Sequence, residues 1–149
     1  MKKVIFFTKV LIIYLLFNSN ALAVKGDYFI EGKIFFDKKE FAKSKILFEK
    51  DIVFNPKNER SYLYLAKIFN KNENDQEQEI NLKNVLLINP QNDEAIYMLV
   101  LLKIKQSNYD EAKELIKNFN LVCTSFCSKR TEIQDKLDKL IPENEKVDN

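Results

Sequence analysis

Apolar residues recur at intervals of three and four along most of the chain, and short polar segments separate the stretches that show this pattern. In residues 59–71, for example, Tyr62, Leu65, Ala66 and Phe69 are apolar. This spacing is typical of helices that bury one face. The pattern predicts helices at about residues 26–37, 41–54, 59–71, 75–88, 93–105, 109–119 and 129–141. Because the chain has only two glycines, three prolines and no long β-branched alternation, we expect an all-α fold.

One short phrase occurs twice in the chain. Asn55-Pro56-Lys57-Asn58 follows one apolar run, and Asn89-Pro90-Gln91-Asn92 follows another. Proline cannot continue a helix, because it lacks the backbone N–H and clashes with the preceding turn. Asparagine can accept a hydrogen bond from the first turn of the next helix. The phrase therefore predicts a turn between two helices, and the interval from Pro56 to Pro90 is the period of a helix–turn–helix repeat.

Related residues stand at matching places in successive frames of this period. The first helices have a small residue, Gly32 or Ala66, followed by an aromatic one, Phe35 or Phe69. The second helices carry three matching sets: Phe41, Ser44 and Phe48; Asp75, Gln78 and Leu82; and Tyr109, Ala112 and Ile116. Together with Asn108-Tyr109-Asp110-Glu111-Ala112, this pattern resembles the tetratricopeptide repeat (TPR) family. The chain departs from the family pattern at four positions: Gln78, Val100, Lys103 and Thr124.

The resemblance implies one domain over residues 24–141, a right-handed α-solenoid of three TPR helix–turn–helix repeats. The repeats would cover about residues 25–58, 59–92 and 93–126. A stack of repeats leaves its last apolar face open to water, so we expect the amphipathic segment at about 129–141 to form a capping helix. Residues 142–149 are polar, and we expect a flexible tail there.

The first 23 residues have the three parts of a secretory signal peptide. Lys2 and Lys3 give a basic start, residues 10–17 form an uninterrupted apolar run, and Ala21-Leu22-Ala23 matches a signal-peptidase site. We expect cleavage after Ala23 and export of the chain to the periplasm or exterior of a bacterial cell. A membrane anchor is the alternative if the leader is retained, although the run is shorter than the ~20 residues of a membrane span.

The net charge of the chain does not indicate nucleic-acid binding. The formal net charge is +2, but Lys2, Lys3 and Lys9 belong to the leader, and without them 21 basic and 22 acidic residues remain. The chain has no histidine, and we find neither a glycine-rich phosphate loop nor a recognisable nucleophile motif. We therefore expect no enzymatic activity, no metal site and no cofactor. Acid pairs such as Asp110-Glu111 are typical of solvated helix surfaces.

Cys123 and Cys127 are the two cysteines of the chain. In an exported protein two thiols usually form a disulfide. Residues four apart in an α-helix have Cα atoms about 6 Å apart, which a disulfide can span. Free or intermolecular thiols are one alternative. A thiol–disulfide redox protein is another, although such proteins use C-x-x-C beside a βαβ unit, and this chain has neither.

The TPR resemblance implies that the first helices of the repeats line a concave groove. The twelve positions expected to face it are Phe29, Lys33, Phe36, Arg60, Leu63, Lys67, Asn70, Lys71, Tyr97, Leu101, Ile104 and Lys105. Apolar and aromatic residues interleaved with five bases suit a peptide. We expect a scaffold or adaptor that binds another protein, through an acidic segment or a free C-terminus, with no membrane span after leader cleavage. Two other readings remain open: the apolar members are core, or the repeats assemble with copies of themselves as a structural homo-oligomer.

One ligand class is not expected. TPR domains that clamp the C-terminal carboxylate of cytosolic chaperones use a set of lysine, asparagine and arginine side chains. The corresponding positions here are Phe29, Lys33, Tyr64, Glu94 and Met98. Only one lysine of that set is kept, so the chain lacks the family's carboxylate clamp.

Overall fold

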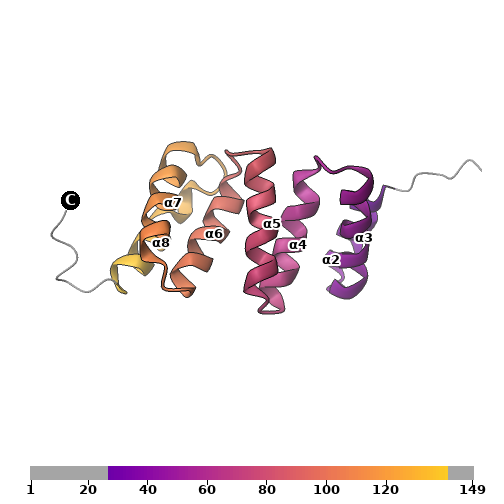
Figure 1. Cartoon of the computed structure of the whole chain (residues 1–149), viewed down its shortest axis with the longest axis horizontal. Helices are drawn as coiled ribbons and strands as arrows, with labels where there is room; N and C mark the ends of the chain where they lie inside the picture. Colours follow the sequence, from indigo (N-terminus) through magenta and orange to yellow (C-terminus); the bar gives the residue numbers. More distant parts are fainter. Residues whose placement is uncertain (1–26, 141–149) are drawn as a thin grey trace, which may run out of the picture.

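The computed structural model describes residues 27–140, and the described part is entirely helical (Figure 1). Its elements are α2 (Tyr28–Asp37), α3 (Phe41–Phe54), α4 (Glu59–Lys71), α5 (Asp75–Ile88), α6 (Asp93–Lys105), α7 (Tyr109–Val122), the short 3-10 helix η1 (Cys127–Lys129) and α8 (Arg130–Asp138). The predicted leader at residues 1–23 and the predicted tail at 142–149 lie outside the described residues. Within residues 27–140, no helix is both long enough and apolar enough to cross a membrane.

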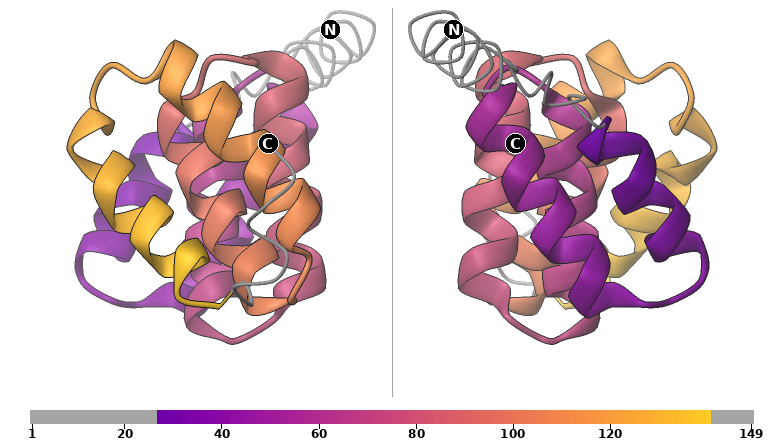
Figure 2. Two further views of the ribbon diagram at one scale, coloured as in Figure 1. Left: turned by 90° about the vertical axis from the view of Figure 1, so that its left-hand side faces the viewer. Right: turned by 90° about the vertical axis from the view of Figure 1, so that its right-hand side faces the viewer.

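The helices form three antiparallel pairs, α2–α3, α4–α5 and α6–α7, which follow one another along the long axis (Figure 1). Viewed from either end, the pairs stack behind one another (Figure 2). The three pairs and the following α8 confirm the predicted solenoid of helix–turn–helix repeats. Local signals begin most of these helices: the side chains of Asp27, Asn74, Asn92 and Asn108 accept hydrogen bonds from the backbone N–H three residues on.

The turn within each pair has the same backbone conformation. Lys39, Glu73 and Ser107 adopt left-handed φ values of 62°, 55° and 58°. The interval between successive members of this set equals the interval from Pro56 to Pro90. A left-handed residue is costly without glycine, yet none of the three is glycine. Identical turns place the two helices of each pair in the same relation, and this keeps the repeats alike even where their side chains differ.

Gly32 lies where the two helices of the first repeat approach most closely, as the repeat pattern predicts. A Cβ atom on Gly32 would come within 2.8 Å of the Phe48 ring, and the Ser44 hydroxyl donates to the Gly32 carbonyl at 2.8 Å. In the second repeat, Gln78 occupies the position of Ser44 and is buried, with no hydrogen-bond partner for its Oε1 within the described residues. The departure at Gln78 therefore places a longer polar side chain at this buried position, where the first repeat has a serine.

The core continues from repeat to repeat and ends under α8. One cluster joins the first repeat to α4, a second joins the second repeat to α6, and a third lies within the last repeat. Ile133 and Leu137 of α8 are fully buried in that third cluster, against Ile96, Val100 and Phe119. The C-terminal helix therefore caps the stack, because it covers the apolar face that the last repeat would otherwise expose.

Candidate binding surface

Three of the twelve predicted groove residues belong to the core. Phe29, Leu63 and Ile104 are buried, and Phe29 packs against the rings of Phe48 and Tyr64. An apolar stripe on a helix gives the direction of burial only approximately, and these side chains fall on the core side of it. They support the neighbouring surface residues and cannot contact a partner directly.

The predicted groove residues of the third repeat are partly covered by the C-terminal segment. Tyr97 and Leu101 pack against the cluster that includes α8, and the Tyr97 ring lies 5.7 Å from that of Phe126. The Tyr97 hydroxyl donates to Glu132 Oε1 at 2.9 Å. Burial, with this hydrogen bond, raises the pKa of Tyr97, whereas Lys129 above all, with Tyr97 and Lys136, lowers the pKa of Glu132 to about 2. Tyr97 therefore holds the capping helix in place.

The five predicted bases are less available than the sequence suggested. Three of them form ion pairs, at N–O distances of 2.6–2.8 Å: Lys33 with Asp37, Lys67 with Glu94, and Lys105 with Asp75. Arg60 and Lys71 are exposed and have no ion-pair partner within residues 27–140. The positive charge that remains free on the first helices is therefore concentrated at these two residues of α4.

Arg60 and Lys71 belong to a stripe along α4 that also contains Tyr64 and Lys67; we call these four residues the α4 stripe. Their spacing of three and four places them on one side of the helix. The Arg60 guanidinium carbon lies 4.2 Å from the centre of the Phe29 ring, and Lys71 Nζ lies 5.3 Å from the centre of the Phe41 ring. Aromatic rings thus support both cations, which restricts their side chains and leaves their N–H groups free for an anionic partner.

Tyr64 is the residue of this stripe that the groove prediction missed. Its ring contacts those of Phe29, Phe36 and Phe48, and Lys67 Nζ lies 4.9 Å from its centre. The sequence could have indicated Tyr64 as a surface residue of the stripe, because it lies four residues from Arg60 on the same side of the helix. Phe36 is half-buried against Tyr64, and Asn70 is exposed near the end of the helix. The stripe therefore carries a half-buried aromatic ring between its two unpaired cations.

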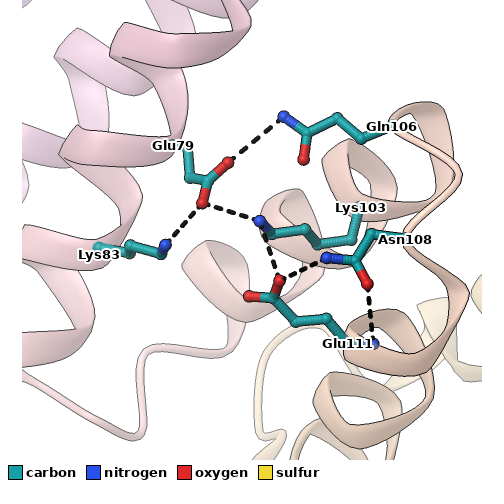
Figure 3. A network of polar contacts seen from close by, with 6 residues as sticks. All are labelled: Glu79, Lys83, Lys103, Gln106, Asn108 and Glu111. Atoms are coloured by element: carbon teal, nitrogen blue, oxygen red, sulfur yellow. Dashed lines mark hydrogen bonds and ion pairs between the residues drawn. The ribbon is translucent and has the colours of Figure 1, made fainter.

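A separate charged cluster lies between the second and third repeats (Figure 3). Lys103 is 4% exposed, and its Nζ donates to Glu79 at 2.7 Å and lies 3.0 Å from Glu111. Lys83 and Gln106 also donate to Glu79. Hydrogen bonds from Lys103 and then Lys83 lower the pKa of Glu79 to about 2. Burial alone would lower the pKa of Lys103, but its bonds to the two glutamates raise it. The cluster ties α5, α6 and α7 together.

Cys123 and Cys127 form a disulfide, as predicted, with Cα atoms 5.2 Å apart. The bridge closes a loop and not a turn of helix, because α7 ends at Val122. The backbone N–H groups of residues 124, 125 and 126 all donate to Asp93 Oδ2, at 2.7, 2.7 and 2.9 Å. Burial would raise the pKa of Asp93, but these bonds lower it. The loop thus anchors the start of α8 to the start of α6.

A hollow of about 450 Å³ lies elsewhere, between α7 and α8. The residues that line it are Asn120, Arg130, Thr131, Gln134 and Asp135. None of these residues belongs to the first helices of the repeats. Within the described residues, no cluster of three or more histidine, cysteine, aspartate or glutamate side chains could hold a metal ion.

The stacked helix pairs are typical of helical repeat proteins, and comparison with solved structures shows which kind of repeat they resemble. The TPR2B domain of yeast Sti1 in its complex with pHsp70 has a TM-score of 0.70 and 17% identity, over 76% of this chain and 95% of that one. The Sgt2 TPR domain from Aspergillus fumigatus has a TM-score of 0.66 and 15% identity, and the match covers 82% of each chain. The CopN–Scc3 complex has a TM-score of 0.63 and 14% identity, and the match covers 83% of this chain and 79% of that one.

These similarities show that the chain has the TPR fold. Family models and curated protein sequences give no match. The fold predicted from the repeated turn phrase is therefore confirmed by three-dimensional similarity at an identity of 14–17%.

Proposed function

We propose that the chain is a non-enzymatic protein-binding module, a scaffold or adaptor, and that the α4 stripe binds a segment of another polypeptide. The TPR fold supports this proposal, since two similar structures, those of Sti1 and CopN–Scc3, are complexes. The observation that carries it is the pair of cations, Arg60 and Lys71, each fixed on an aromatic ring and without an acidic partner among residues 27–140. Such a pair, about three helical turns apart, suits a segment with two separated carboxylates.

The ligand that we propose is an acidic segment or a free C-terminus. The paired lysines Lys33 and Lys67 contribute less, because a partner carboxylate would have to displace Asp37 or Glu94. The half-buried rings of Phe36 and Tyr64 offer an apolar side chain a place between the cations. Tyr97 is not an anchor for the ligand in this proposal, because its ring and hydroxyl hold the C-terminal segment.

Charge reversal tests the stripe. An array of short peptides with acidic, neutral and basic sequences and free carboxyl ends would be titrated against the wild type, Arg60→Glu and Lys71→Glu. We expect acidic peptides to be preferred and each variant to bind them at least about tenfold more weakly at low salt, with a smaller effect at high salt. Lys117→Glu on α7 makes the same charge change at an exposed residue outside the stripe. Equal weakening by Lys117→Glu, or none by the stripe variants, would exclude the α4 stripe as the site.

We also propose that the module acts in the envelope of a bacterium, on the basis of the predicted leader. N-terminal sequencing of the exported protein should begin at Val24. An intact leader in the membrane fraction would instead make this an anchored protein, and it would leave the proposal for the α4 stripe untouched.

A further inference from the structure

The second helices of the three repeats each expose one large apolar side chain at the same place. Val53, Leu87 and Leu121 are 75%, 83% and 85% exposed, and they stand at equivalent positions of the three repeats. Phe54, next to the first of them, is 56% exposed. An isolated exposed leucine is ordinary, but the same position is left open to water in all three repeats. Core packing cannot account for this row, because none of its members is buried.

The row follows one edge of the solenoid. Residues 53, 87 and 121 each lie in the last turn of α3, α5 or α7. These three helix ends lie along the upper edge in Figure 1. We call this the inter-repeat edge; it comprises those helix ends and the turns at residues 55–58, 89–92 and 123–126. Because the second helices run in the same direction, equivalent residues at their ends form a line across all three repeats.

Four exposed lysines lie at this edge. Lys50 and Lys57 form no ion pair within the described residues, whereas Lys83 and Lys117, one turn before Leu87 and Leu121, pair with Glu79 and Glu114. Asp51 and Asp93 are buried and hydrogen-bonded, and Glu59 accepts from Asn89, whereas Asp27, which caps α2, and Glu31 in its first turn are exposed acids. Apolar side chains are therefore flanked by lysines along one line.

The chain that precedes the fold enters at the same edge. The Tyr28 ring at the start of α2 stacks on the ring of Phe54 at the end of α3, with 5.6 Å between their centres. The segment before Asp27 contains the apolar run 10–17, which the sequence predicts to be a membrane-targeting leader. Until it is cleaved after Ala23, a leader in the membrane would keep Tyr28 at this edge only a few residues along the chain from the lipid.

We propose that the inter-repeat edge docks on the surface of an anionic lipid bilayer, with Val53, Leu87, Leu121 and Phe54 in the interfacial layer and the lysines at the headgroups. Apolar residues combined with lysines are the pattern by which surface segments bind anionic membranes. Tyr64, Lys67 and Lys71 of the α4 stripe lie farther along α4 and stay free for a polypeptide, whereas Arg60 lies two residues beyond the turn at 55–58 and borders the edge. The exported protein would thus hold its partner close to the membrane, and this docking does not depend on the proposed peptide binding.

Co-sedimentation of the exported chain with vesicles tests the proposal. Vesicles of phosphatidylglycerol and phosphatidylcholine would be compared with phosphatidylcholine alone, at low and high salt. We expect binding to the anionic vesicles, weakened by salt. Val53→Ser/Leu87→Ser should reduce it about tenfold or more, and Lys57→Glu should reduce binding only to the anionic vesicles. All three substituted residues are exposed, so each variant should fold, and circular dichroism would verify this.

Ile46→Ser/Ile80→Ser is the matched control, because it removes two exposed isoleucines from the same helices, about two turns before the row. This control should bind as the wild type does. The proposal is overturned if the exported chain does not bind anionic vesicles, or if the control loses as much binding as the row variant. It is also overturned if light scattering shows that Val53→Ser/Leu87→Ser abolishes self-association instead, since the row would then join copies of this chain.

Discussion

Replacing Glu79 by glutamine tests whether the buried Lys103 cluster stabilises the junction of the second and third repeats. Glu79 has a pKa of about 2, against its ordinary 4.5. At about 1.4 kcal/mol per pKa unit, this difference corresponds to about 3 kcal/mol of folding free energy at neutral pH. The Glu79 side chain is 19% exposed, so solvent screens it only in part. We expect Glu79→Gln to lower the free energy of unfolding by about 2–3 kcal/mol at pH 7.

The sign of the pH dependence follows from the lowered pKa. Ionised Glu79 stabilises the fold above about pH 4.5, and this stabilisation is lost as the pH falls toward 2. The difference between wild type and Glu79→Gln should therefore shrink to about 1 kcal/mol at pH 3. Urea unfolding followed by circular dichroism, repeated from pH 3 to pH 7, measures this difference in the free energy of unfolding.

The control for this experiment is Glu114→Gln. Glu114 pairs with Lys117 on the surface, and its side chain is 73% exposed. Surface ion pairs contribute little, so the change should be within about 0.5 kcal/mol at every pH. A Glu79→Gln variant that is as stable as wild type at pH 7, or whose deficit does not change with pH, would refute the reasoning.

Three further predictions concern the first repeat, the turns and the disulfide. Gly32→Leu should lower the unfolding free energy by about 1–3 kcal/mol or more, since even a Cβ would meet the Phe48 ring; an unchanged Tm would contradict this close approach. Ser107→Gly should raise the unfolding free energy by about 1 kcal/mol, because glycine adopts its left-handed φ of 58° without strain; a lower Tm would show that the serine side chain is needed. Thiol labelling of exported protein should find Cys123 and Cys127 unreactive until a reductant is added; two reactive thiols would mean that the bridge does not form in the cell.

Much of the fold could be predicted from the sequence because its signals are local. Each copy of the Asn-Pro turn phrase ends one helix just before the next begins, through residues that are neighbours in the chain. Asn92 caps the following helix as predicted, whereas the Asn58 side chain donates to Asp51 and makes no cap. The constant period of the pattern then implies similar helix pairs, and the structure confirms them. The position of Gly32 at the helix–helix contact followed from the same period. The disulfide was also predictable from the cysteines and the leader, and it lies between α7 and α8.

The candidate site could be predicted only in part, because a periodic pattern gives the side of a helix on which a residue lies and not the neighbour it meets. Lys67 finds Glu94 and Lys105 finds Asp75 across helices that belong to different repeats. Lys103, which breaks the repeat pattern, is buried only because two glutamates from α5 and α7 converge on it. These pairings depend on how the repeats stack. The sequence by itself determined the helices and their period. The tertiary structure decided which charges remain free, because burial and ion pairing are properties of neighbours that are distant in the chain.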